Sequence, residues 1–212
     1  MNEQQTTTTL IRQLVRFDAA IVSDCLAGNE HAMSAAIKPL DPAWKLCGPA
    51  FTVNCRPGDN LMLHLAVAHA KPGDVLVACT NQHYEAGYWG EILTIAAMER
   101  GIAGLVIDGS VRDVAPIVQL GYPVFTRAVS IKKAEKNNVG KLQSPTVVGG
   151  VMVHPGDVIL ADGSGIAVVP AARLEEVVRA AEEKVAFEQK IIEQLRQGYF
   201  TVDLFDLRKY EV

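Results

Sequence analysis

Short apolar runs bounded by glycine- and proline-containing turns recur along much of the chain. Val75–Cys79 follows the turn Pro72-Gly73-Asp74, and Gly104–Ile107 is a second such run, so we predict two buried strands. Between them, Glu91–Arg100 has a helical composition and is followed by Gly101, a typical helix stop. A strand, a helix and a strand in this order predict a parallel crossover.

The other apolar patterns indicate the same kind of architecture. Asn60 is expected to cap a helix that runs to about Ala70. Glycine turns separate short apolar runs near the C-terminal third, which suits a second sheet layer stacked on the first. No linker is evident, so we expect residues 1–212 to form one α/β layered domain rather than a simple doubly wound sheet. The remaining predicted elements are short helices at 9–17 and 20–26, a strand at 50–54, a helix that ends at Gly121, a strand at 124–125, a charged surface loop at 132–141 and short strands within 145–169.

A stripe of apolar residues at alternate spacings of four and three predicts a C-terminal helix over 171–198, beginning after Pro170. Glu188 lies on this stripe, where burial of a carboxylate without a partner is costly. In one interpretation the helix protrudes, and Glu188 reaches water or pairs with a lysine. In the other, the stripe crosses a subunit interface and Glu188 reaches a neighbouring active site. The apolar members are Leu174, Val178, Ala181, Val185, Ile192 and Leu195.

Two segments carry the strongest candidates for chemistry. One is Gly90-Glu91-Ile92-Leu93, and the other is Asp108–Asp113, which follows the next predicted strand. Ligands of such α/β units collect at the carboxyl ends of the strands. The first backbone N–H groups of the helix, near Ile92 and Leu93, have no partner within the helix. Together with Gly90 they form a candidate site for a substrate carboxylate.

Arg112 and Asp113 would complete this site. Arg112 is always charged and can bind the carbonyl or carboxylate oxygens of a keto acid with two N–H groups. Asp113 is a hard oxygen ligand suited to Mg²⁺ or Mn²⁺, and Glu91 could join the metal directly or through a metal-bound water that carries protons. Each residue alone has an ordinary explanation, such as a loop salt bridge. Their combination predicts a site that binds a small 2-oxo acid and stabilises its enolate.

Several other polar or aromatic residues have two interpretations. His64 lies among apolar residues, where packing is the usual role, but it could also bind a substrate carboxylate or orient a water. Tyr88 and Trp89 either pack in the core or form a wall of the pocket. Lys132 and Lys133 have polar surroundings that do not readily depress a lysine pKa, which argues against a Schiff-base mechanism.

Composition narrows the classes of function. The net charge of −4 gives no electrostatic footprint for nucleic acid, and no apolar run is long enough to span a bilayer. The polar, Thr-rich N-terminus is not typical of a secretion signal. Four scattered cysteines are expected to be reduced core residues of a cytoplasmic protein. The expected partner is therefore a small oxo acid rather than nucleic acid or membrane.

Taken together, these motifs resemble the RraA-like family, and within it the 4-hydroxy-4-methyl-2-oxoglutarate / 4-carboxy-4-hydroxy-2-oxoadipate aldolases. The resemblance covers nearly the whole chain. Its Pro-Gly-Asp turns are weakly specific, whereas the Arg-Asp pair is much more specific. The motifs are Gly58-Asp59-Asn60, Met62-Leu63-His64, Pro72-Gly73-Asp74-Val75-Leu76-Val77, Gly87-Tyr88-Trp89-Gly90-Glu91, Gly104-Leu105-Val106-Ile107-Asp108-Gly109, Val111-Arg112-Asp113, Pro155-Gly156-Asp157-Val158-Ile159 and Asp203-Leu204-Phe205-Asp206-Leu207-Arg208.

The resemblance implies an αββα sandwich of the swivelling β/β/α type and a divalent-metal pyruvate aldolase that forms homotrimers or homohexamers. It implies that Arg112 binds the pyruvyl oxygens, that Asp113 holds the metal and that His64 lies near the pocket. It also implies that an acidic residue at the position of Glu188 comes from the adjacent subunit. One departure is visible, because the resembling aldolases carry Asp where this chain has Glu91.

The expected function is therefore metal-dependent retro-aldol cleavage of a 4-hydroxy-2-oxo acid, with Mg²⁺ or Mn²⁺ as cofactor. An oxaloacetate decarboxylase would use the same site and the same enolate. A non-catalytic regulator of ribonuclease activity is a further alternative, but such relatives lack the Asp of the Arg-Asp pair, so Asp113 favours the enzyme. A methyltransferase has little support, because no Gly-rich nucleotide loop follows the first strand.

Overall fold

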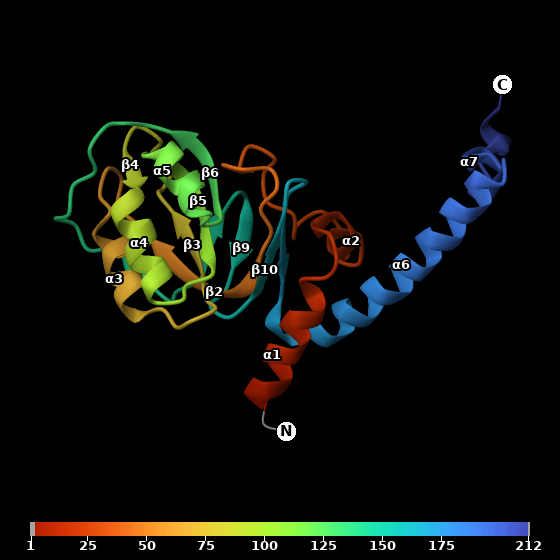
Figure 1. Ribbon diagram of the computed structural model, residues 1–212, viewed down its shortest axis with the longest axis horizontal. Helices are drawn as coiled ribbons and strands as arrows, with labels where there is room; N and C mark the ends of the chain where they lie inside the picture. The colour runs from red at the N-terminus through yellow and green to blue at the C-terminus, as the bar shows by residue number, and fades with distance from the viewer. Residues whose placement is uncertain (1–2, 212) are drawn as a thin grey trace.

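A curled sheet forms the centre of the computed structural model, which describes residues 3–211 (Figure 1). Its strands are β1 (Lys38–Pro39), β2 (Leu46–Asn54), β3 (Val75–Cys79), β4 (Gly87–Trp89), β5 (Gly104–Val111), β6 (Val124–Val129), β7 (Lys141–Leu142), β10 (Val158–Ala161) and β11 (Ile166–Val169). β2, β3, β5 and β6 lie side by side and run parallel, and β10 and β11 continue the sheet antiparallel beyond β2. A separate hairpin pairs β8 (Thr146–Val148) with β9 (Val151–Val153).

Both faces of the parallel strands are buried, which explains why their sequences are continuously apolar. On β3, Leu76 and Ala78 belong to one core cluster, whereas Val75 and Val77 belong to a second cluster on the opposite face. The second cluster includes Val148 and other residues of the β8–β9 hairpin. The hairpin therefore forms the second β layer.

Helices cover the remaining surfaces of the sheet. They are α1 (Glu3–Leu14), α2 (Ala19–Asp24), α3 (Leu61–His69), α4 (Glu91–Glu99), α5 (Val114–Leu120), α6 (Leu174–Arg196) and α7 (Thr201–Leu204), with 3-10 turns at Ala171–Arg173 and Arg208–Tyr210. Apolar residues of α3, α4 and α5 pack on the face of the parallel strands opposite the hairpin (Figure 1). Helices therefore cover one face of the parallel strands and the hairpin covers the other, so a site can open only at an edge of the sheet.

The long helix α6 packs on the body only through its first half. Leu174, Val178 and Ala181 are buried, and the first two belong to a third core cluster with α1, α2, β10 and β11. Lys184 still pairs with Asp24 of α2 at 2.8 Å, and the later turns of α6 extend from the body on the side away from α3 and α4 (Figure 1). Ile192 on the predicted stripe is 43% exposed there, so the apolar stripe continues beyond the part of α6 that packs on the body.

The predicted fold class is confirmed, with several corrections of detail. α1 begins at Glu3, earlier than predicted, and the short strand β4 was not predicted at all. β5 continues to Val111, so Asp108 lies within the strand rather than at its end. The Asp108 carboxylate pairs with Arg127 and accepts the backbone N–H of Gly149 at 2.9 Å, which ties β5 to the β8–β9 turn.

α3 begins where it was predicted, after Asn60, but the hydrogen bonds at its start differ from the prediction. Asn60 occupies the N-cap position, but its Nδ2 donates to the carbonyl oxygen of Tyr88 at 2.8 Å. The backbone N–H of Leu61 is instead accepted by Oδ1 of Asp59 at 2.9 Å. The prediction of a side-chain cap by Asn60 was therefore wrong, because this amide joins α3 to β4 and the preceding carboxylate satisfies the first helical N–H.

Two further findings concern membrane-spanning helices and the cysteines. Within residues 3–211, no helix combines the length and apolar character that a membrane crossing requires. All four cysteines are free thiols. Cys55 is buried, as predicted for a core residue, whereas Cys25, Cys47 and Cys79 are half-buried at the edges of the core clusters, so the prediction of burial holds only for Cys55.

Candidate active site

A cavity of about 300 Å³ opens where β4 and β5 end beside the start of α4. Arg112 and Asp113 directly follow Val111, the last residue of β5, and Gly90 directly precedes α4. Since β4 and β5 run parallel, their carboxyl ends lie at the same edge of the sheet. The structure thus brings together the two segments that the sequence analysis singled out.

Asp113 has an unusual backbone conformation at the centre of this site. It occupies the N-cap position of α5 with left-handed angles of φ 56° and ψ 43°, which are uncommon for a residue other than glycine. Its Oδ2 accepts the backbone N–H of Glu91 at 3.2 Å and lies 3.6 Å from Nε of Arg112. The carboxylate therefore sits at the N-terminus of α4, where the helix dipole favours negative charge. Such strained residues cluster at functional sites.

Two glycines give the Arg-Asp pair the room it needs. A Cβ atom on Gly90 would lie 2.4 Å from Oδ2 of Asp113. A Cβ atom on Gly87 would lie 2.5 Å from the carbonyl oxygen of Ser130 and 3.0 Å from Cβ of Arg112. At Gly87 the short contact is with backbone, so glycine is a steric requirement there, whereas a side chain at Gly90 would displace the Asp113 carboxylate.

The first turn of α4 is held firmly. Oγ1 of Thr94 donates to the carbonyl oxygen of Gly90 at 3.0 Å and accepts the indole N–H of Trp89 at 2.7 Å, and both side chains are fully buried. Leu93 is buried in the core, whereas Ile92 is 77% exposed at the cavity. The N–H groups of Ile92 and Leu93 lie in this first turn, where no intrahelical acceptor exists. They are fixed donors beside the cavity.

His64 and Asn60 come to the cavity from α3 and its N-cap. Burial, and after it the charge of Lys136, lowers the pKa of His64 below its ordinary value of 6.5. A lower pKa favours the neutral imidazole, which can both donate and accept a hydrogen bond. Tyr88 is fully buried in the core and also lines the cavity, so it has both of the roles considered for it.

The charged loop that the sequence predicted on the surface, near the mouth of the active site, contributes two cations. We call residues 130–140 the basic strap, since they connect β6 to β7 across this edge of the sheet. Lys133 and Lys136 of the strap line the cavity. The available signal was positional: the strap follows the carboxyl end of β6, which is parallel to β5 and ends at the same edge.

The two acidic candidates outside the Arg-Asp pair are placed differently. Glu91 supplies its backbone N–H to Asp113, but its side chain is exposed and does not line the cavity within the described residues. Glu188 lies on the protruding half of α6, where its carboxylate is 3.5 Å from Nζ of Lys184. Within one chain, Glu188 therefore forms an ion pair on the helix surface and is not part of the cavity.

The side chains at the cavity could hold only a metal ion that takes few ligands from the protein. Among residues 3–211 there is no group of three or more His, Cys, Asp or Glu side chains arranged to hold a metal ion. Asp113 is 40% exposed and provides a carboxylate at the cavity. Mg²⁺ commonly retains several waters and is held by one or two carboxylates together with its substrate. Asp113 fits such an ion, provided that the substrate supplies further oxygens.

With this geometry in place, comparison with known proteins gives the class to which the chain belongs. Residues 19–168 match the family described as "RraA-like: Aldolase/RraA", and the chain is a member of that family. It is 35% identical, over 83% of each chain, to a protein of Halalkalibacterium halodurans named "Putative 4-hydroxy-4-methyl-2-oxoglutarate aldolase".

Solved structures agree with this family and fold. An uncharacterised protein from Pseudomonas syringae pv. tomato superposes with a TM-score of 0.83 at 30% identity, covering 91% of each chain. RraAS2 from Streptomyces coelicolor, described as an unusual member of the RNase ES inhibitor RraA protein family, superposes with a TM-score of 0.75 at 28% identity. That likeness covers 89% of this chain and 96% of RraAS2. Proteins similar to this chain therefore include both proteins named as putative aldolases and a member of a family named after an RNase inhibitor.

Proposed function

We propose that this protein is a divalent-metal-dependent aldolase that cleaves a 4-hydroxy-2-oxo acid to pyruvate and a second oxo acid. The observation that carries the proposal is the Asp113 carboxylate, held 3.2 Å from the Glu91 N–H and 3.6 Å from Arg112 beside a cavity. The relatives named as 4-hydroxy-4-methyl-2-oxoglutarate aldolases support the same substrate class. The candidate substrates are 4-hydroxy-4-methyl-2-oxoglutarate and 4-carboxy-4-hydroxy-2-oxoadipate.

The residues of the cavity have complementary roles in this proposal. The N–H groups of Ile92 and Leu93, next to Gly90, bind the C1 carboxylate of the substrate, because a helix N-terminus favours an anion. Arg112 donates to the C2 oxygen. When the C3–C4 bond breaks, its electron pair moves to this oxygen as the enolate forms, and a fixed cation stabilises the developing charge. His64 binds a substrate oxygen or orients a water.

The proposed cofactor is Mg²⁺ or Mn²⁺, held by Asp113. When bound, such an ion supplies Lewis-acid stabilisation of negative charge on the substrate oxygens. Asp113 is suited to hold it because its position is fixed by the Glu91 N–H, while its side chain stays accessible from the cavity.

Proton transfer requires a base for the 4-hydroxyl group. We assign this role to Glu91 together with Glu188 of a second copy of the chain. As the 4-hydroxyl loses its proton, a carbonyl forms at C4, and the released enolate gains a proton at C3 to give pyruvate. The exposed side chain of Glu91 lies one residue from the cavity-lining Gly90.

A shared site of this kind requires association of copies, and we propose a homotrimer or homohexamer. The distal half of α6 carries an apolar stripe that has no covering element within the described chain, with Ile192 43% exposed. The α4 surface beside the cavity also exposes apolar side chains, Ile92 at 77% and Ile95 at 43%. These two surfaces lie at opposite ends of the molecule (Figure 1), so they can meet only between copies.

Pyruvate release from 4-hydroxy-4-methyl-2-oxoglutarate tests the proposal. We expect release with Mg²⁺, loss of release with EDTA, and loss in Asp113→Ala. We also expect that borohydride with pyruvate leaves activity intact, because no lysine forms a Schiff base. Release that is insensitive to EDTA, or inactivation by borohydride, contradicts the metal-dependent mechanism. Glu188→Gln tests the shared site separately, since unchanged turnover and unchanged metal affinity would exclude Glu188.

Oxaloacetate decarboxylation is the second candidate, because the same Arg112 and α4 groups would bind oxaloacetate and stabilise the same enolate. Relative turnover on oxaloacetate and on the hydroxy-oxo acids decides between them. A regulator of ribonuclease activity, the kind of protein after which the family of RraAS2 is named, gains support only if neither substrate is turned over.

A further inference from the structure

The basic strap is exposed, yet several backbone hydrogen bonds attach it to the elements beside the cavity. The backbone N–H of Gly87 donates to the carbonyl oxygen of Lys132 at 2.8 Å. Further along, the N–H of Glu135 donates to the carbonyl oxygen of Gly58 at 2.8 Å, and the N–H of Asn60 donates to the carbonyl oxygen of Glu135 at 2.9 Å. The strap is therefore attached to β4 and to the start of α3.

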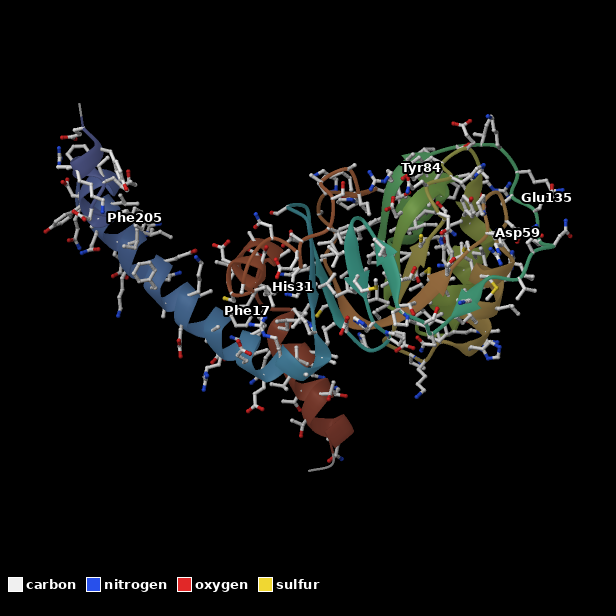
Figure 2. All side chains as sticks on the ribbon, turned by 180° about the vertical axis from the view of Figure 1, so that it is seen from behind. Phe17, His31, Asp59, Tyr84, Glu135 and Phe205 are labelled. Atoms are coloured by element: carbon white, nitrogen blue, oxygen red, sulfur yellow. The ribbon has the colours of Figure 1, made fainter. Side chains whose placement is uncertain are left out.

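Asp59 is the main fastening of the strap. Its side chain is 1% exposed, and its Oδ2 accepts the backbone N–H of Asn137 at 2.6 Å and that of Asn138 at 2.9 Å. The side-chain amide of Asn138 adds a bond to the same oxygen at 3.2 Å. Figure 2 shows Asp59 and Glu135 near each other at the end of the domain far from α6. A buried carboxylate is tolerated only when it is well hydrogen-bonded, and here those bonds serve the strap.

The strap makes the cavity strongly cationic. Among the described residues that line it, Arg112, Lys133 and Lys136 are cations and Asp113 is the single carboxylate. Lys133 lies 3.9 Å from a carboxylate oxygen of Glu135, at the limit of an ion pair. Lys136 forms no ion pair with any residue in the described range 3–211. If Arg112 and Asp113 serve the pyruvyl end of a substrate, the positive charge of Lys136 remains unpaired.

Lys133 and the residue before Lys136 are attached to different elements beside the cavity. The backbone of Lys133 forms a β-bridge with the backbone of Gly87, and Gly87 lies against the side chain of Arg112. Lys136 follows Glu135, whose backbone forms a β-bridge with the backbone of Asp59 at the start of α3. The charge of Lys136 acts on His64 of that helix. A ligand that spans from Arg112 to the His64 side would therefore present its far end to Lys136.

We propose that the basic strap selects substrates with a second carboxylate, that Lys136 binds this distal carboxylate and that Asp59 is the positioning residue that holds the strap in place. The proposal rests on the proposed function for the identity of the reaction. Its chemistry is that of an oxo acid with an anionic group remote from the pyruvyl end, matched to a free ammonium group.

A pair of substrates isolates the distal carboxylate. 4-Hydroxy-4-methyl-2-oxoglutarate and 4-hydroxy-2-oxopentanoate undergo the same C3–C4 cleavage, but only the first has a carboxylate on C4. We expect Lys136→Met to lower kcat/KM for the dicarboxylate about 10- to 100-fold, the range for loss of one hydrogen bond to a charged group. The loss should appear mainly in KM, the monocarboxylate should change by less than about twofold, and Lys136→Arg should restore most of the preference.

Lys132→Met is the matched control, because Lys132 belongs to the same strap but pairs with Glu85 and does not line the cavity. It should leave the preference intact. Asn138→Ala removes one bond to Asp59 and should reduce the preference in the same direction as Lys136→Met, with little further loss in the double variant. Equal losses on both substrates in Lys136→Met, or a wild type without preference, would overturn the proposal.

If the wild type releases pyruvate from neither substrate, the proposed function fails and the strap is judged by binding alone. Calorimetric titration with 2-oxoglutarate and 2-oxopentanoate then makes the same comparison between two ligands that differ in the distal carboxylate. Tighter binding of 2-oxoglutarate that disappears in Lys136→Met supports the strap. Equal affinities in the wild type, or a preference that persists in the variant, refutes it.

Discussion

Gly90→Ala tests most directly whether the position of the Asp113 carboxylate matters for activity. The added Cβ would lie 2.4 Å from Oδ2 of Asp113 and 3.3 Å from Nε of Arg112. Ordinary van der Waals contact begins at 3.4 Å, so the Asp113 carboxylate must retreat by about 1 Å. Gly90 itself is extended, with φ −158°, and alanine adopts this backbone conformation freely. The perturbation is therefore confined to the side chains of the Arg-Asp pair.

A misplacement of about 1 Å at a reacting centre costs roughly 100-fold in rate, or about 2.7 kcal/mol of transition-state stabilisation. The free energy of unfolding should change by less than about 1 kcal/mol, because Arg112 and Asp113 are 41% and 40% exposed and their ion pair contributes little to stability. We expect a large loss of activity in a protein that remains folded.

The assay is kcat/KM for metal-dependent pyruvate release, with urea unfolding measured in parallel. Gly165→Ala is the matched control, because a Cβ at that position meets no atom within 4 Å. Activity of Gly90→Ala within about threefold of the wild type would refute the reasoning, since it would mean that the position of Asp113 does not limit the reaction.

Three further outcomes are expected. Arg112→Lys should lower kcat/KM about 10- to 100-fold, because an ammonium group cannot replace the two parallel N–H donors; a smaller loss in steady-state kinetics would show that a point charge suffices. Lys136→Met should raise the pKa of His64 toward, but not to, its ordinary value of 6.5, because burial remains; NMR titration of the imidazole would show no shift if Lys136 does not act on it. Hydrogen bonds hold the pKa of Asp59 below its ordinary value despite burial, so its contribution to stability is complete above about pH 4 and is lost as the pH falls through the lowered pKa. The difference in unfolding free energy between the wild type and Asp59→Ala should therefore shrink on acidification, and a constant difference in urea titrations would contradict this.

Sequence patterns predicted the elements whose burial is uniform or periodic. β3 was predicted with its observed bounds, because a strand covered on both faces is apolar throughout and is preceded by a Pro-Gly turn. α4 was predicted to within one residue for similar reasons. β4 was missed, since three residues are too few to show alternation and its pairing partner, β5, comes later in the chain.

The candidate site, too, could be predicted only in part from the sequence. Arg112, Asp113 and the start of α4 could be placed together from sequence, because parallel strands end at the same edge of a sheet. Lys136 could not be placed there, because its position depends on the tertiary hydrogen bonds of an irregular loop to Asp59. The predicted role of Glu188 remains a prediction, since it depends on a second copy of the chain.

The attachment of the basic strap to Asp59 leaves its side chains free to diverge among proteins with this scaffold. Asp59 holds the strap mostly through the backbone N–H groups of Asn137 and Asn138, and almost any residue supplies such a donor. Side chains elsewhere on the strap, Lys133 and Lys136 among them, are thus free to change without loosening it. Substrate range could then drift or be engineered by single substitutions on a fixed frame, while the groups that would act on the pyruvyl end stay untouched.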